Sequence, residues 1–402
     1  MAKKDIPYLK VVKPPDNPKE VRKEEKRRKG KLRRAKFRRA LVPVILAALA
    51  VCGTWLLLNN QTYGRARTAS SFQQDLSDTN SYVQFADGIV RYNRDGVVYL
   101  NRKNEEQWIQ STQIQNPIIV TKEHAFAVAD NGGNSIFVFS EEGLKGEIET
   151  NLPVERIAIS DQGIVSAVLS NESSPQIVTY DAAGNILVEQ QVTMSNTGYP
   201  IGLEMSDDGN VLAVTYLHTE GTNITSRVAY YNFGEAGQEQ SDHRVTADTY
   251  SDTIMSEVFF MGNDRSVVVG DNSFVIYHGS DVPEKEKEVV LNQEIRSVFH
   301  SDKYIGFILL NQEKSGYELR LFNRSGDQVI NREISGEYSN VKIDGDEVLL
   351  YEGTVCCIMT ATGITKYQGD INTDILEMFR APGLNRYYVM SVNELSVIYL
   401  TK

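Results

Sequence analysis

The sequence predicts an all-β protein: a β-propeller of eight four-stranded blades, preceded by one transmembrane helix and a basic cytoplasmic tail. Three observations lead to this prediction. Short runs rich in Val, Ile, Tyr and Phe follow one another through residues 81–402, divided by Gly, Asp and Asn turns. Two turn motifs recur along these runs. One uncharged run lies between a basic and an acidic part of the chain.

Charge divides the chain of 402 residues into two unlike parts. Residues 1–40 hold 17 Lys+Arg and 5 Asp+Glu, and residues 41–402 hold 25 and 48, a net charge of −23. A dense basic run beside a membrane is attracted to anionic lipid headgroups. We therefore expect residues 1–40 to form a cytoplasmic tail that contacts lipid. RNA binding is the weaker alternative, because Tyr8 and Phe37 are the only aromatic residues available for stacking.

The uncharged run covers residues 41–58 and reads LVPVILAALAVCGTWLLL. As a helix it would span about 27 Å, close to the ~30 Å hydrocarbon core of a bilayer. Because the positive residues precede it, the N-terminus should stay cytoplasmic and the C-terminal domain should be extracellular. Signal cleavage near Gly64 and lipidation at Cys52 are the alternatives. The long basic start favours an uncleaved anchor in the cell membrane.

The turn motifs repeat at the spacing of propeller blades. Residues 159–168 align with residues 205–214 without a gap, and each pair of strands is joined by an Asp-containing turn with a glycine. In a second motif an aromatic strand runs into a polar turn, with glycines at 143, 184, 326 and 363. A period of roughly 40–50 residues with four strands per unit is typical of a β-propeller.

The last repeat shows three strands, which raises the question of how the ring closes. Residues 59–80 are either a linker or the missing strand, placed at about 68–80, and supplying it would remove a free sheet edge. Seven blades would result if the first and last units shared one blade. The predicted blades are 81–111, 114–151, 154–193, 199–248, 253–292, 294–335, 337–372 and 374–402.

The first blade carries a family resemblance. Residues 88–111, GIVRYNRDGVVYLNRKNEEQWIQS, resemble a blade of the quinoprotein-like propellers, with Trp108 in the outer strand. The other tryptophan, Trp55, lies in the predicted span, so the repeated tryptophan docking of those proteins is absent. The whole plan resembles an uncharacterised (domain-of-unknown-function) family of single-pass membrane proteins from Gram-positive bacteria. That resemblance implies an extracellular quinoprotein-like propeller and no particular activity.

Residues that could carry chemistry are scattered. No GxSxG, P-loop or HExxH motif is present, so we expect no catalytic residue, no metal ion and no cofactor. The stretches 130–134 and 207–210 favour β-turns over calcium loops, because neither has the full ligand pattern. No pair of histidines has metal-ligand spacing among His124, His218, His243, His278 and His300.

Two further features concern a strand and three loops. Cys356 and Cys357 are neighbours on a strand, so their side chains should point to opposite faces as small core residues rather than form a disulfide. Residues 216–227 and 232–244 read as long loops, and 281–290 as a charged excursion. Loops often carry binding sites, so a partner could bind there.

These observations favour a membrane-anchored extracellular propeller that acts as a protein- or ligand-binding scaffold in the cell envelope, without catalysis. Its partner would be an envelope protein or a wall component. Nucleic acid is not expected, because the domain after the span is strongly acidic. The alternative is a quinoprotein-like or carbohydrate-active enzyme that uses the propeller channel, since the fold alone does not decide function. A transmembrane sensor is a weaker third possibility.

Overall fold

The computed structural model of the chain separates it into two compact units, Met1–Gln61 and Thr62–Lys402. The predicted tail, residues 1–40, and half of the predicted span, residues 41–58, lie outside the described residues. Among the residues that are described, no helix is long and apolar enough to cross a membrane. The structure describes residues 41, 43, 45, 47–50, 53–54, 61–73, 80–170, 174–195, 197–220, 223–240, 242–311, 316–336, 338–392 and 394–402.

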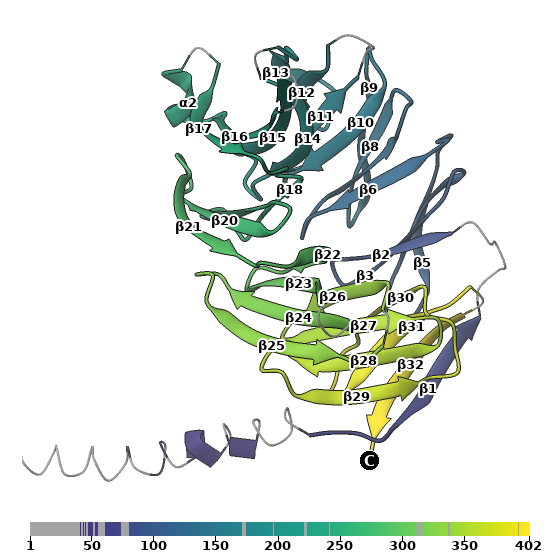
Figure 1. Cartoon of the computed structure of the whole chain (residues 1–402). Coiled ribbons are helices and arrows are strands. Elements are labelled where there is room, and N and C mark those ends of the chain that lie inside the picture. The colour runs from purple at the N-terminus through teal and green to yellow at the C-terminus, as the bar shows by residue number, and fades with distance from the viewer. Residues whose placement is uncertain are drawn as a thin grey trace, which may run out of the picture. The chain divides into compact units, whose positions relative to one another are not determined.

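The second unit is a closed ring of eight blades, each a four-stranded antiparallel sheet (Figure 1). The first strand of each blade lies near the centre and the fourth lies at the rim. Eight clusters of buried apolar side chains form the core, one between each pair of consecutive blades. The cluster that contains Ile89 and Phe379 joins the last blade to the first. The prediction of eight blades rather than seven is confirmed.

The strands of the first four blades follow chain order. Blade 1 contains β2 (Ser81–Phe85), β3 (Gly88–Tyr92), β4 (Gly96–Leu100) and β5 (Glu106–Ser111). Blade 2 contains β6 (Pro117–Thr121), β7 (Phe126–Asp130), β8 (Ser135–Ser140) and β9 (Gly143–Glu149). Blade 3 contains β10 (Val154–Ile159), β11 (Val165–Leu169), β12 (Gln176–Tyr180) and β13 (Ile186–Gln191). Blade 4 contains β14 (Tyr199–Met205), β15 (Val211–Glu220), β16 (Asn223–Asn232), the short helix α2 (Glu235–Gln238) and β17 (Arg244–Ser251).

The remaining blades continue the pattern until the last one. Blade 5 contains β18 (Glu257–Phe260), β19 (Arg265–Val269), β20 (Ser273–His278) and β21 (Glu284–Val290). Blade 6 contains β22 (Glu294–His300), β23 (Tyr304–Asn311), β24 (Gly316–Asn323) and β25 (Gln328–Ile334). Blade 7 contains β26 (Asn340–Asp344), β27 (Glu347–Glu352), β28 (Val355–Thr360) and β29 (Thr365–Asp370). Blade 8 contains β30 (Glu377–Arg380), β31 (Arg386–Met390), β32 (Glu394–Thr401) and β1 (Arg65–Gln73).

Burial along the strands explains their composition. Every residue of β7 (FAVAD) and β11 (VSAVL) is buried, because neighbouring blades cover both faces of these middle strands. The outer strands β5 and β13 alternate between exposed and half-buried residues, because they lie at the rim. All strands of blades 1 to 7 lie inside the predicted units except β17, which runs three residues past 248.

The repeated motifs are turns on one face of the ring. The first motif is the turn between the first and second strands of a blade, with Gly163 at φ 89° and Gly209 at φ 72°. The second motif is the turn between the third and fourth strands, with Gly184 at φ 84° and Gly326 at φ 70°. Glycine adopts positive φ without steric cost. Since antiparallel strands alternate in direction, both kinds of turn lie on the same face, which we call the entry face. The opposite side is the far face.

The ring closes through β1, which pairs with β32 from Arg65 opposite Thr401 to Gln73 opposite Glu394. Its start lies at the entry face, because the N–H of Gly64 donates to the Thr401 carbonyl over 3.1 Å. The sequence places a closing strand at about 68–80, a few residues too late. The reason is that β1 is a rim strand whose residues are all exposed or half-buried. Ala66 packs against the core of blades 7 and 8, and Phe72 against that of blades 8 and 1.

Candidate functional site

A cavity of about 460 Å³ lies at the mouth of the central channel on the entry face. Blades 2 to 6 line it with the ends of their first strands and the turns that follow. We call it the channel mouth. Its lining includes one ammonium group, one imidazole, one phenyl ring and five carboxylates: Lys122, His300, Phe260, Glu123, Asp161, Glu204, Asp207 and Asp302.

Lys122 crosses the channel mouth from blade 2 to blade 4. Its Nζ lies 2.8 Å from Glu204 Oε1 and 3.1 Å from Asp207 Oδ1. Burial alone would lower the pKa of Lys122, but the two carboxylates raise it above its ordinary value. Burial raises the pKa of Glu204, and Lys122 opposes that effect. Lys122 therefore stays positive, and the pair holds blades 2 and 4 together across the channel.

His300 lies on the opposite side of the channel mouth, at the end of β22. Its imidazole stacks on the ring of Phe259, with the ring centroids 3.8 Å apart and the planes 4° from parallel. The protein atoms around the imidazole, helped by the charge of Lys122, lower the pKa of His300 below its ordinary value. The residue as a whole is exposed to solvent. At neutral pH it therefore offers a neutral ring that can exchange hydrogen bonds with a ligand in the cavity.

Hydrogen bonds between neighbouring turns hold the channel mouth in shape. The N–H of His124 in blade 2 donates to Asp161 Oδ1 in blade 3 over 3.1 Å. The N–H of Asp161 donates to the Asp207 carbonyl in blade 4 over 2.9 Å. The N–H of Asp208 then donates to Asn263 Oδ1 in blade 5 over 3.0 Å. The mouth is thus a preorganised polar ring that can bind a small polar or cationic ligand.

Sequence reasoning missed this cluster, because its members come from five blades and share no motif. One local signal could have found part of it. Glu204 is a charged residue within a first strand, which is the strand that borders a propeller channel. A carboxylate at that position has to face the solvent of the channel or form an ion pair.

The second candidate region is an extension of blade 4. The strands β15 and β16 have ten residues each, whereas the corresponding strands of blades 1 and 3 have five. The added residues form a β-ladder that includes His218 opposite Thr225 and Thr219 opposite Ile224. This hairpin extends on the far face, and Ile224 near its end is 38% exposed. We call residues 217–220 and 223–226 the blade 4 hairpin.

The structure corrects the loop predictions in this region. Residues 216–227 are mostly the hairpin strands rather than a loop, because β15 and β16 pair without interruption out to Glu220 opposite Asn223. Residues 232–244 contain α2, which lies on the entry face beside a cavity of about 490 Å³. Residues 281–290 are mostly the outer strand β21, whose charged side chains face solvent at the rim.

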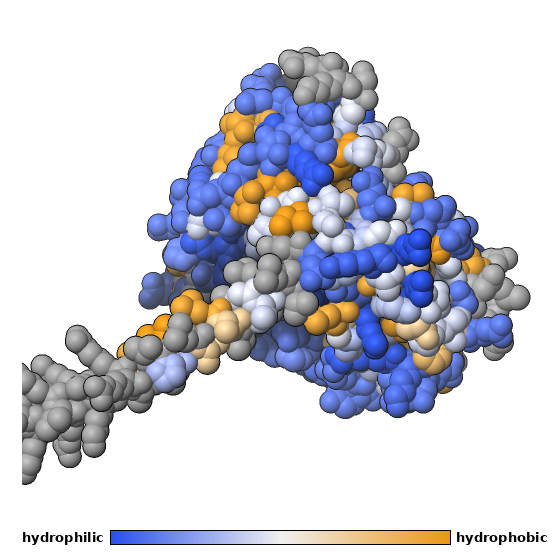
Figure 2. Space-filling model, turned by 90° about the horizontal axis from the view of Figure 1, so that it is seen from below, coloured by the Kyte–Doolittle hydropathy of each residue, from blue (hydrophilic) through white to orange (hydrophobic). Residues whose placement is uncertain are grey.

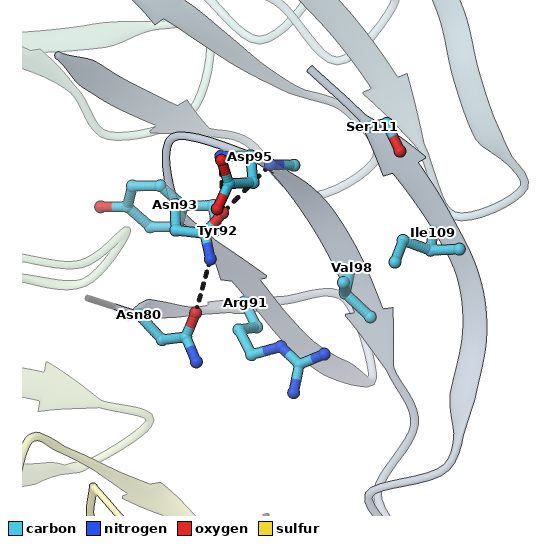
Figure 3. A pocket seen from close by; sticks show the side chains of 9 residues that line it. Asn80, Arg91, Tyr92, Asn93, Asp95, Val98, Ile109 and Ser111 are labelled. Atoms are coloured by element: carbon cyan, nitrogen blue, oxygen red, sulfur yellow. Dashed lines mark hydrogen bonds between the residues drawn. The ribbon is translucent and has the colours of Figure 1, made fainter. Parts of the chain in front are cut away.

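A further cavity of about 310 Å³ lies on blade 1 (Figure 3). The amide of Asn93 donates to Asn80 Oδ1 over 2.9 Å, and its oxygen accepts the N–H groups of Asp95 and Gly96. Arg91 lies 3.1 Å from Glu106. The polar groups that line this cavity therefore stabilise the local turn, and we assign it no ligand.

The five histidines do not come together. His278 Nε2 lies 3.9 Å from Asp264, and the ring of His243 meets that of Phe233 edge-on. His124 lies in the first turn of blade 2 and His218 in the blade 4 hairpin. Over the described part of the chain, no group of three His, Cys, Asp or Glu side chains could hold a metal ion.

The carboxylates of the two acidic turns accept hydrogen bonds from nearby groups of the protein. Asp130 Oδ1 accepts the N–H groups of Gln115 and Asn116, over 3.0 and 2.8 Å. Asp208 Oδ1 accepts the hydroxyl of Ser206 and the N–H of Asn210, over 2.7 and 3.1 Å. Both stretches are turns, as the sequence favoured.

The adjacent cysteines also match the expectation. Both are free and buried. Cys356 packs between blades 7 and 8 and Cys357 between blades 6 and 7, on opposite faces of β28. Burial raises the pKa of the Cys356 thiol to about 12 and that of Cys357 to about 11. Neither thiol is a nucleophile at neutral pH.

The fold defines the class of this protein: it is an eight-bladed β-propeller with a polar channel mouth and a blade 4 that extends past both neighbouring blades. The chain belongs to a family of unknown function, DUF5711, which matches residues 59–400. The match spans all eight blades, including β1. No curated protein matches the sequence.

Solved structures share the fold at low sequence identity. BamB from Moraxella catarrhalis is 12% identical, with a TM-score of 0.51, and the match covers 84% of this chain and all of that one. Sqt1 from Saccharomyces cerevisiae is 10% identical, with a TM-score of 0.51, and the match covers 83% of this chain and 99% of that one. These likenesses show the fold alone.

Proposed function

We propose that this protein is a binding scaffold of the cell envelope, anchored by residues 41–58 with its propeller outside the cell. The blade 4 hairpin is the surface that binds a protein partner. The observation that carries the proposal is the unequal length of the blades. Blade 4 extends past its neighbours on the far face, while the chain enters the ring at blade 8. In a ring of eight these two blades lie opposite each other (Figure 1).

The support for the anchor comes from the sequence alone. The uncharged run and the 17 basic residues before it favour a cytoplasmic N-terminus held against anionic lipid headgroups. The resemblance to single-pass membrane proteins of Gram-positive bacteria supports a Gram-positive host, and the partner we propose is an envelope protein or a wall component. The anchor is tested with the full chain in cells. It should resist alkaline extraction, and added protease should digest the propeller but not residues 1–40. Release by alkali would contradict the anchor.

The hairpin is tested by site-specific photocrosslinking in cells. A crosslinking residue replaces Thr219 in the blade 4 hairpin or, as a matched control, Asn272 in the short far-face turn of blade 5. We expect a discrete adduct several-fold stronger at Thr219. Ile224→Asp should abolish it, because the exposed apolar side chain lies opposite Thr219. Equal adducts at both positions would reject the hairpin as the binding surface.

The channel mouth supports a second function, a ligand or catalytic site for a small polar molecule such as an amino sugar. The supporting observation is the convergence of one imidazole, one phenyl ring and five carboxylates in a single cavity. Glucosamine should raise the melting temperature of the full chain more than glucose does. Asp302→Asn should reduce that difference and leave the Lys122 ion pairs intact. Equal shifts with both sugars would reject a cationic ligand.

A further inference from the structure

The chain that joins the proposed membrane span to the propeller is short. The span ends at residue 58 and β1 begins at Arg65, so residues 59–64 form the whole connection. Six extended residues reach at most about 20 Å. If the anchor proposed above is correct, on which this inference rests, the entry-face end of β1 lies within that distance of the bilayer. Blade 8 is therefore the part of the propeller nearest to the membrane.

The surface at that end of blade 8 combines cationic and apolar side chains. The turn between β30 and β31 lies beside the start of β1: the Asn385 carbonyl accepts the N–H of Leu400, and the Asn385 amide donates to the Tyr63 hydroxyl. Leu384 in this turn is 67% exposed, the highest value among the large apolar residues that the structure describes. We call this surface the blade 8 corner, formed by Arg65, Leu384, Arg386 and Lys402.

The cations of the blade 8 corner are available to an external anion. Arg65, Arg386 and Lys402 are exposed, and none forms an ion pair with a carboxylate in the described part of the chain. The nearby acidic turn of blade 7 is already engaged. Asp344 accepts the N–H of Arg380 over 2.6 Å, and Asp346 lies 3.2 Å from Lys303.

We propose that the blade 8 corner rests on the anionic headgroups of the leaflet from which the span emerges. Charge complementarity supports this, because the residues after 40 carry a net charge of −23 and an anionic surface would repel most of the domain. The basic corner is attracted to the anionic headgroups while the acidic remainder of the domain is repelled, so the propeller is oriented with blade 8 toward the membrane. Figure 2 shows the side of the molecule on which the C-terminus lies in Figure 1, and this side is mostly hydrophilic with scattered apolar areas, which suits contact with headgroups. The blade 4 hairpin, on the opposite side of the ring, then points away from the membrane.

The test uses the full chain in vesicles of phosphatidylcholine with about one-third phosphatidylglycerol, carrying a headgroup-linked quencher. A fluorophore is attached through Leu384→Cys or, as a matched control, through Leu187→Cys on β13, which is 50% exposed at residue 187. Cys52→Ser removes the one cysteine outside the propeller, and the two buried thiols label slowly because their pKa values are raised. We expect quenching at position 384 to exceed that at position 187 several-fold.

Removing the three cations shows whether their charge, rather than the short tether alone, holds blade 8 at the membrane. R65Q/R386Q/K402Q should lower the fraction of protein in contact by about tenfold, whereas the matched triple R94Q/K145Q/R156Q, at exposed cations outside blade 8, should not. Vesicles without phosphatidylglycerol should weaken the contact in the same way. Equal quenching at positions 384 and 187, or quenching that survives loss of the cations, would overturn this inference. In that case resistance to alkaline extraction would show that the anchor still stands, and extraction by alkali would reject both.

Discussion

The contact between blades 1 and 2 and the contact between blades 5 and 6 use the same position of the fold with unlike residues. In the outer strands of blades 1 and 5, a β-bulge follows the turn on the entry face. The first residue after the bulge faces the next blade. In blade 1 that residue is Trp108, paired with Tyr99. In blade 5 it is Lys287, paired with Ile276. We call this position the docking position.

Both residues contact the same part of the neighbouring blade. That part is the backbone of the turn between its third and fourth strands. Trp108 Nε1 donates to the Glu141 carbonyl over 2.9 Å, and its ring stacks on Phe139 with centroids 5.4 Å apart. Lys287 Nζ donates to the carbonyls of Ser325 and Gly326, over 3.0 and 2.9 Å. One contact is mainly apolar and the other is mainly polar.

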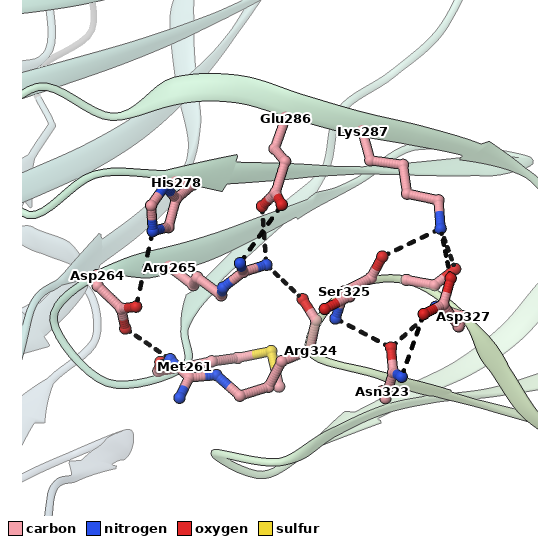
Figure 4. Close-up of polar contacts among 11 residues, drawn as sticks. Met261, Asp264, Arg265, His278, Glu286, Lys287, Asn323, Arg324, Ser325 and Asp327 are labelled. Carbon is pink, nitrogen blue, oxygen red and sulfur yellow. Dashed lines mark hydrogen bonds and ion pairs between the residues drawn. The ribbon is translucent and has the colours of Figure 1, made fainter.

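Further polar contacts join the same turn of blade 6 to the first two strands of blade 5 (Figure 4). Arg324 in the turn of blade 6 donates to the Met261 carbonyl over 2.7 Å and lies 2.6 Å from Asp264. Arg265 donates to the Arg324 carbonyl over 2.8 Å and pairs with Glu286 over 2.7 Å. At the docking position a charged side chain thus replaces the tryptophan, whereas Phe274 of blade 5 still stacks on Phe307 of blade 6 in the core.

The other blades show how general the docking position is. Thr246 of blade 4 donates to the Pro283 carbonyl over 2.7 Å. Gly146 of blade 2 lies against the Ala182 carbonyl, and Ile330 of blade 6 lies beside Gly363. The comparison teaches that the bulge and the turn specify the interface, and that different residue types can complete it.

The largest expected effect comes from removing the aromatic contact. Trp108→Ala should lower the free energy of unfolding by about 3 kcal/mol, because it leaves a space beside Phe139, Phe126 and Tyr99. Urea denaturation of the full chain in detergent measures it. Trp108→Phe keeps the stack and should lose about 1 kcal/mol, the value of the hydrogen bond. If Ile109→Ala, at a 65% exposed neighbour, lost as much as Trp108→Ala, the docking position would have no special role.

Gly146→Ala tests the tightest form of the same contact. An added Cβ would lie 1.8 Å from the Ala182 carbonyl oxygen, so the blades would have to separate. We expect a loss of about 2 kcal/mol, measured by the same denaturation. Gly64→Ala is the matched control, because no atom lies within 4 Å of its added Cβ. A neutral Gly146→Ala would mean that blades 2 and 3 are not in this close contact.

Lys287→Met removes the polar version of the contact and keeps most of the side chain. We expect a loss of about 1 kcal/mol or less, because the Lys287 side chain is 39% exposed and water can replace its partners. High salt should reduce the loss further, while the effect of Trp108→Ala should not change with salt. A loss that salt leaves unaltered would indicate packing rather than charge.

The smallest expected effect is a pH dependence of the Lys287 contact between blades 5 and 6. Hydrogen bonds from Lys287 and Asn323 lower the pKa of Asp327 below its ordinary 3.8. A carboxylate with a lowered pKa stabilises the fold above that ordinary value, and the stabilisation is lost as the pH falls through the folded-state pKa. The melting-temperature difference between wild type and Lys287→Met should therefore shrink below pH 4, whereas that for Trp108→Ala should not. Parallel changes in both differences would contradict the assignment to Asp327.

Much of the fold could be predicted from short stretches of sequence. Strand patterns and the turn glycines at 163, 209, 184 and 326 are local features, because a glycine at positive φ and alternating apolar residues act over a few residues. The opposite facing of Cys356 and Cys357 follows from the strand period alone. These local signals determined the all-β class, the eight units and the approximate start and end of each blade.

The tertiary structure decided what depends on residues far apart in the chain. It set the first residue of β1, because a rim strand with few buried side chains carries a weak pattern, and pairing with β32 selects its register. It also brought Lys122 to Glu204 and His300 to Phe259, and it gave the docking position its target in the next blade. Local sequence patterns predict the strands and turns of each blade. Which side chains meet across the channel and between blades depends on the closure of the ring, because those residues lie far apart in the chain.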